Sequence, residues 1–208
     1  MPKSRTRKRS TKGKPKSIDW GAASAKGSGR INLILGAVAL VAVVAGGLYL
    51  WQLQQAGSSF EALVAEGQPA LARVETPPDR GGGHLGPGQG HSYDTAFPSS
   101  GIHDRVPVNA GFYTGPQRAT QLVHALEHGN VVIYYDDPGA EARATIEAWT
   151  ALFGGRWDGV VAAPSSGLGK AVTLAAWRKI LKLDSFEPAA AAAFVDAFRG
   201  RGPEKRVR

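Results

Sequence analysis

The chain has 208 residues, with 25 lysines and arginines against 17 aspartates and glutamates, and a formal net charge of +8. Residues 1–30 hold ten of the basic residues and one acid, so this segment carries +9 and the remainder is nearly neutral, which argues against a basic nucleic-acid groove on a folded domain. The sequence has no cysteine and one methionine, which excludes disulfides, cysteine-ligated zinc and a thioether site for Cu(I).

An uncharged apolar segment, residues 31–51, follows the basic tail. At about 1.5 Å per residue a helix over this segment is roughly 31 Å long, which is enough to cross a bilayer once. Tyr49 and Trp51 stand at its far end, where aromatic side chains favour the headgroup level. A buried helix and a cleaved signal peptide are the alternatives, but a signal peptide has a shorter apolar run and a small-residue cleavage site. We therefore predict an uncleaved transmembrane helix over residues 31–52.

The charge on either side of this segment predicts its orientation. Basic residues are retained on the cytoplasmic side, and the first one after the apolar segment is Arg73. We expect residues 1–30 to be a cytoplasmic tail in contact with anionic lipid, and the rest to be periplasmic or extracytoplasmic, at the plasma (inner) membrane. The tail also resembles a nuclear-targeting or nucleic-acid-binding run, but its position beside the apolar segment favours the lipid bilayer as its partner, with no nucleic acid bound.

Residues 53–83 are predicted to be a stalk and linker. A short helix is expected over residues 58–74, interrupted by Gly67 and Pro69, and residues 76–90 are too rich in proline and glycine for regular structure. A compact domain is expected over residues 84–203, followed by a tail at 204–208.

The predicted domain alternates helices with strands. Residues 91–116 read as an ordered loop with short extended pieces, and Gly129 is placed to cap a helix in the left-handed conformation. The remaining expected elements are helices at 117–128, from Pro138 to 153 and from 188, and strands at 130–135, 157–163 and 171–177, the last of which could continue to 183. This order predicts an α/β (α+β) two-layer sandwich with a small mixed sheet, preceded by one transmembrane helix.

All five histidines lie between residues 84 and 128. On the predicted helix, His124, Glu127 and His128 fall within an arc of roughly 100°, opposite an apolar side, so two imidazoles could bind one ion. A solvated helix face is the alternative. The histidines on the preceding glycine-rich loops favour a metal site with these candidate ligands: His84, His103, His124, His128 and Glu127, the last as a ligand or as an acceptor that orients an imidazole. His91 lies on the same loops and stays a candidate at this point.

The donor types restrict the metal. Imidazole and carboxylate without sulfur suit Zn²⁺, Cu²⁺ or Ni²⁺, and Zn²⁺ or Cu²⁺ is the expected cofactor. The letters His124-Ala-Leu-Glu127-His128 also match H-x-x-E-H, the inverted zincin pattern, in which glutamate is the general base. A zincin helix belongs to a larger helical scaffold, whereas here a glycine and a strand follow at once. No catalytic residue and no organic cofactor site are assigned.

The run LVHALEHGNVVIYYD, with the preceding Ser-Gly-Ile-His and Gly-Phe-Tyr segments, resembles the bacterial domain-of-unknown-function family 3105, a membrane-anchored or secreted domain. The resemblance covers about residues 79–203, and the block V-H-x-L-E-H-G is its most specific part. It implies that His103, His124, Glu127, His128 and Gly129 are family positions and that His84 corresponds to the histidine of an upstream glycine-rich segment. Ile102 stands where the family has proline. His91 has no family counterpart, so the resemblance ranks it last and leaves it out of the candidate ligands.

These observations predict a single-pass membrane protein whose outward domain binds a divalent transition metal, for metal handling or as a metal-stabilised module. A structural or partner-binding subunit of an envelope membrane complex, with another membrane protein as partner, is the first alternative. A metal-dependent hydrolase is the second.

Overall fold

The structure, a computed structural model, describes residues 28–208, so most of the predicted basic tail lies outside the described residues. Helix α1 (Ser28–Gly67) contains the apolar segment Asn32–Trp51, whose side chains are exposed. By length and composition this segment can cross a membrane, as the sequence predicts. The segment Gly46–Arg208 forms a compact unit of its own, and the site described below lies within it.

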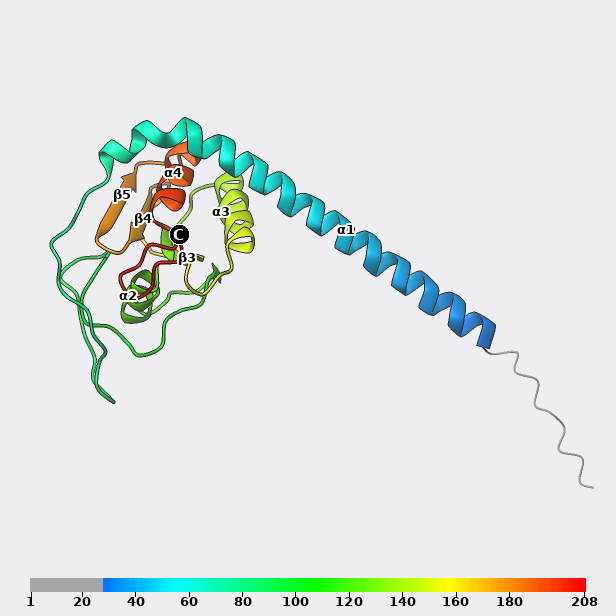
Figure 1. The fold of residues 1–208 in the computed structure, drawn as a ribbon, viewed down its shortest axis with the longest axis horizontal. Helices are drawn as coiled ribbons and strands as arrows, with labels where there is room; N and C mark the ends of the chain where they lie inside the picture. Colours follow the sequence, from blue (N-terminus) through cyan, green and yellow to red (C-terminus); the bar gives the residue numbers. More distant parts are fainter. Residues whose placement is uncertain (1–27) are drawn as a thin grey trace, which may run out of the picture. The chain divides into compact units, whose positions relative to one another are not determined.

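The compact unit is built on a five-stranded mixed sheet (Figure 1). Its strands are β1 (Gly111–Phe112), β2 (Val131–Tyr135), β3 (Val160–Pro164), β4 (Val172–Ala176) and β5 (Lys179–Leu183), in the order β1-β3-β2-β4-β5. Strands β1, β3 and β2 are parallel, whereas β4 is antiparallel to β2 and to β5. The predicted α+β class with a small mixed sheet is confirmed.

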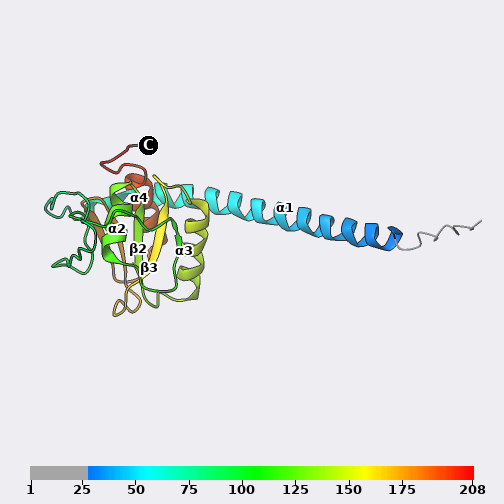
Figure 2. The ribbon, with the colours of Figure 1, turned by 90° about the horizontal axis from the view of Figure 1, so that it is seen from below.

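Helices cover both faces of this sheet. Helix α2 (Ala119–Glu127) lies on one face, and α3 (Ala140–Leu152) and α4 (Pro188–Phe198) lie on the other; Figure 2 shows the sheet between α2 and α3. The reason is that β2 is apolar at every position: Val131 and Ile133 pack toward α3 and α4, and Val132 and Tyr134 pack toward α2. A sheet buried on both faces needs a covering layer on each.

The core begins in the segment that was predicted to be a stalk. Helix α1 continues to Gly67 and is followed by a 3₁₀ helix, η1 (Gln68–Arg73). Phe60, near the end of α1, is only 4% exposed, and its ring packs edge-on against Trp149 and Phe153 of the α3 region, with centroids 5.2 and 4.8 Å away. The end of α1 is therefore part of the packed core.

Two tight backbone features shape the site region. The run at 171–183 is a hairpin of β4 and β5 rather than one strand, and its two-residue turn holds Arg178 at φ 57°. No glycine, asparagine or proline marks this turn, so no local sequence pattern predicts it. Gly129 has φ +95°, which confirms the predicted left-handed cap, and the backbone of Gly202 packs directly against it.

Candidate metal centre

Two glycine-rich loops are paired side by side above helix α2. The amide of His103 donates to the carbonyl of Gly83 at 2.9 Å, and the amide of Leu85 donates to the carbonyl of His103 at 2.7 Å. His84 and His103 form a parallel bridge in this pairing. Gly83 adopts φ +109°, a conformation that glycine reaches without strain. The pairing fixes two histidines that are 19 positions apart in the sequence as neighbours in space.

Four predicted ligands converge where these loops meet α2. One ligand atom from each of His84, His103, His124 and Glu127 lies within 4.8 Å of every other. The ring centroids of His103 and His124 are 4.8 Å apart, and the ring of His84 is 5.1 and 4.9 Å from them. His103 is fully buried and His124 is 4% exposed, whereas His84 is exposed. The cluster therefore lies at the edge of the core, with one side open to solvent.

Backbone carbonyls set the tautomers of the two buried rings. His103 Nδ1 lies 2.8 Å from the carbonyl oxygen of Gly101, and His124 Nδ1 lies 2.7 Å from that of Asp104. A carbonyl oxygen only accepts, so each Nδ1 carries the hydrogen and donates it. In the neutral ring each Nε2 then has a free lone pair. A carbonyl bound to the second ring nitrogen is the usual outer support of a metal-binding histidine.

The Nε2 atom of His103 faces a carboxylate. Its Nε2 is buried and has no hydrogen-bond partner in the described chain, although Glu127 Oε2 lies only 3.0 Å away. A lone pair and a carboxylate oxygen at this distance repel unless a proton or a cation lies between or beside them. Gly82 lies close to the other oxygen of this carboxylate: a Cβ built on Gly82 would be 2.7 Å from Oε1 and 3.7 Å from the ring of Trp177.

His128 turns toward a different acid. Its Nε2 lies 3.0 Å from Glu204 Oε2, and His124, His128 and Glu204 form a second group of ligand atoms within 4.8 Å. The ring of His128 stacks on Trp157 with centroids 4.0 Å apart, and its Nδ1 is buried without a hydrogen-bond partner among the described residues. Glu204 was not predicted from the sequence, because it lies in the predicted tail and no local pattern links it to α2.

Burial keeps the central imidazole neutral. The pKa of His124 is lowered to about 4, first by desolvation and then by positive charge on His128, with smaller contributions of the same sign from His103 and His84; the hydrogen bond to the carbonyl of Asp104 acts in the opposite direction. Desolvation also lowers the pKa of His128, and the carboxylate of Glu204 partly opposes this shift. At neutral pH both rings therefore offer lone pairs rather than positive charge.

The alternative of a solvated helix face is wrong, because His124 and His128 are 4% and 2% exposed. The geometry also departs from an inverted zincin, in which the glutamate stays outside the ligand set. Here Glu127 shares a ligand group with His103 and His124, although His124 and His128 also share the second group, with Glu204. His91 packs against Tyr93, with ring centroids 4.6 Å apart, and is in neither group.

A family model described as "Protein of unknown function (DUF3105)" matches residues 84–208, more than half of the chain. The match begins at the first histidine of the cluster and includes Glu204. No curated protein and no solved structure matches the chain.

Proposed function

This chain belongs to the DUF3105 family, and we propose that it binds one divalent transition metal ion, Zn²⁺ or Cu²⁺, through His84, His103, His124 and Glu127. The observation that carries this proposal is the buried Nε2 of His103, which lacks a hydrogen-bond partner in the described chain and faces a carboxylate. A cation there would be bound by both groups and would remove their repulsion.

The spacing of the four groups suits one ion after a small contraction. Ligands bound at about 2.0–2.1 Å in a tetrahedron are roughly 3.4 Å apart. The four ligand atoms lie within 4.8 Å of one another, so no separation needs to shorten by more than roughly 1.4 Å. His84 is exposed and lies on a loop, so its ring can make this movement while the two buried rings stay on their carbonyls.

Four protein ligands fill a tetrahedral site, which favours binding and stabilisation over hydrolysis. The ligands come from two loops and α2, so an ion would tie these segments together. His128 and Glu204 support the cluster from the neighbouring side, and Glu204 joins the C-terminal segment to α2. We therefore favour a metal-stabilised, metal-binding domain, with a partner-binding subunit of a membrane complex as the alternative role.

The apolar part of α1 would anchor this domain to the plasma membrane, with the basic N-terminal tail in the cytoplasm. The sequence contains no cysteine, so single cysteines can report the topology. Ser166→Cys, at an exposed site, should react with an impermeant maleimide on intact cells, and Ser10→Cys only after lysis. The opposite pattern would contradict the orientation.

Metal binding is tested on the full-length chain in an uncharged detergent. After loading with Zn²⁺ or Cu²⁺ and gel filtration, elemental analysis should give about one ion per chain at pH 7. His103→Ala and His124→Ala should lose it. His91→Ala is the matched control, since His91 is outside both ligand groups, and should keep it. No bound metal in the wild type, or equal loss in the control, would overturn the proposal.

Circular dichroism of the same variants distinguishes a metal ion that stabilises the fold from one that the protein only handles. If His124→Ala unfolds and chelator lowers the melting temperature of the wild type, the ion stabilises the fold. If the metal is lost while the fold stays intact, a role in metal handling is favoured.

A further inference from the structure

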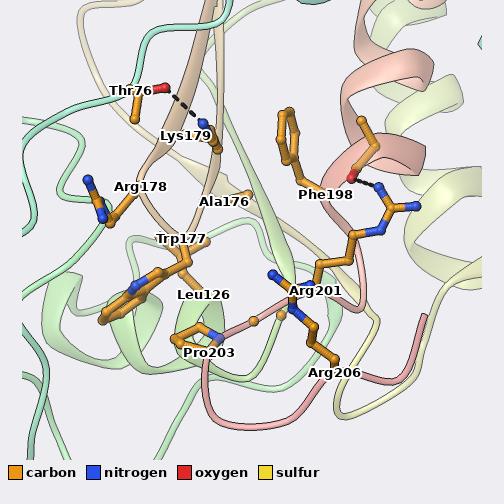
Figure 3. Close-up of a pocket in the computed structure, with 13 residues that line it drawn as sticks. Thr76, Leu126, Ala176, Trp177, Arg178, Lys179, Phe198, Arg201, Pro203 and Arg206 are labelled. Atoms are coloured by element: carbon orange, nitrogen blue, oxygen red, sulfur yellow. Dashed lines mark hydrogen bonds between the residues drawn. The ribbon is translucent and has the colours of Figure 1, made fainter.

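A second, chemically different site lies beside the hairpin turn, apart from the four proposed ligands. It is a cavity of about 520 Å³ between the β4–β5 turn, the end of α4 and the C-terminal segment (Figure 3). This volume is in the range of small-molecule sites. Trp177, Phe198 and Leu126 contribute apolar walls, and Gly129 and Gly202 let the backbone approach closely at its base.

The charged groups that line this cavity are all positive. They are Arg178, Lys179, Arg201 and Arg206, and among the described residues the lining includes no aspartate or glutamate. This is a local concentration of positive charge, because the chain beyond residue 30 has a net charge close to zero. Of the four, Arg178 forms an ion pair, with Asp79 at 3.2 Å, and in Figure 3 its guanidinium points away from Phe198.

The other three cations have no carboxylate partner within residues 28–208. Lys179 Nζ donates to the hydroxyl of Thr76 at 2.8 Å and lies 5.9 Å from the ring centroid of Phe198. Arg201 donates to the carbonyl of Ala197, and Arg206 forms no side-chain hydrogen bond or ion pair within the described chain. Their charges are available to a ligand.

The backbone brings two of these residues together, although the guanidinium of Arg201 turns to the carbonyl of Ala197, away from that of Arg206 (Figure 3). Arg201 and Arg206 face each other in an isolated antiparallel bridge, which places both side chains on the same side of the pair. Like charges in this position destabilise the pairing, and a bound anion would reverse the effect. In Figure 3 the guanidinium of Arg206 points toward the middle of the group, below Phe198.

We propose that this cavity binds an oxyanion carried on an apolar group, a phosphate monoester or a carboxylate. Lys179, Arg201 and Arg206 bind the anion, and Trp177 and Phe198 contact the apolar group. Guanidinium and ammonium donors form charge-assisted hydrogen bonds with both kinds of oxyanion, so the two ligands share one recognition chemistry. The site needs no metal, so it stands independently of the proposed metal centre.

The test is calorimetric titration of the full-length chain, in an uncharged detergent at low salt, with phenyl phosphate and separately with benzoate. At least one should bind, and more tightly than inorganic phosphate, because the aromatic walls contact the phenyl group. Arg206→Ala and Lys179→Ala should each weaken binding about tenfold or more. Arg206→Lys should restore part of the affinity, because it keeps the charge.

Lys182→Ala is the matched control, since Lys182 is on the same strand as Lys179 but pairs with Glu75 outside the cavity. It should bind like the wild type, and all variants should keep their metal content. The proposal is overturned if neither anion binds at millimolar concentration, if inorganic phosphate or uncharged benzyl alcohol binds as tightly, or if the control loses as much affinity as Lys179→Ala.

Discussion

Acid should destabilise the metal-free protein through His124. Burial lowers the pKa of this residue from 6.5 to about 4 in the folded chain. The unfolded chain therefore takes up a proton more readily than the folded one, so stability is complete above about pH 6.5 and falls as the pH falls toward 4. Between pH 7 and pH 5 the loss amounts to about 2 kcal/mol, and below pH 4 this group adds no further loss.

The assay is urea denaturation of the chelator-treated full-length chain at pH 7 and pH 5, followed by circular dichroism. The wild type loses free energy of unfolding between pH 7 and pH 5. In His124→Gln this loss should be smaller by about 2 kcal/mol. A smaller slope should remain, because the pKa of His128 is also lowered. His91→Gln should keep the wild-type slope. The reasoning would be refuted if His124→Gln kept that slope as well.

Three substitutions test the packing of the domain, at the site and in the core. Gly82→Ala places a methyl group against the carboxylate of Glu127 and should weaken metal binding about tenfold or more in a metal titration. Gly90→Ala is the control: its added methyl group has no atom within 4 Å, so metal binding should stay unchanged. Phe60→Ala should lower the free energy of unfolding by about 3–5 kcal/mol in urea, and a loss below about 1 kcal/mol would mean that the end of α1 is not part of the core. In Gly129→Ala the added methyl group would lie 2.7 Å from the amide nitrogen of Gly202 and 2.9 Å from the carbonyl oxygen of Trp157, on a residue with a left-handed φ. The free energy of unfolding should fall by about 2 kcal/mol or more in the same assay. A neutral result would contradict the close approach of the C-terminal segment.

The two ligand groups share His124, and this sharing limits what the cluster can bind. Its Nδ1 donates to the carbonyl of Asp104, so only Nε2 can bind a metal. His124 can therefore serve either the group with His103 and Glu127 or the group with His128 and Glu204. The first group has four members and the unpartnered Nε2 of His103, which is why we assign the ion to it.

The sequence by itself determined the features that depend on local patterns. The long apolar segment of α1 and the buried strand Val131–Tyr135 follow from continuous apolar runs, and the helix over Ala119–Glu127 follows from hydrophobic periodicity. The left-handed cap at Gly129 follows from the conformational freedom of glycine. The crowding of histidines into one stretch of chain also pointed to the region in which His84, His103 and His124 lie close to Glu127. Composition alone excluded sulfur ligands, because the chain has no cysteine.

Only the tertiary structure decided which side chains meet. Helical spacing placed His124 and His128 together, yet Glu204, far along the chain, pairs with His128, and His103 lies beside Glu127. The pairing of two irregular loops and the return of the C-terminal segment to α2 depend on backbone hydrogen bonds between distant residues, which leave no periodic trace in the sequence. The same holds for the hairpin turn at Arg178 and for the basic cavity beside it, because both arise where separate elements pack.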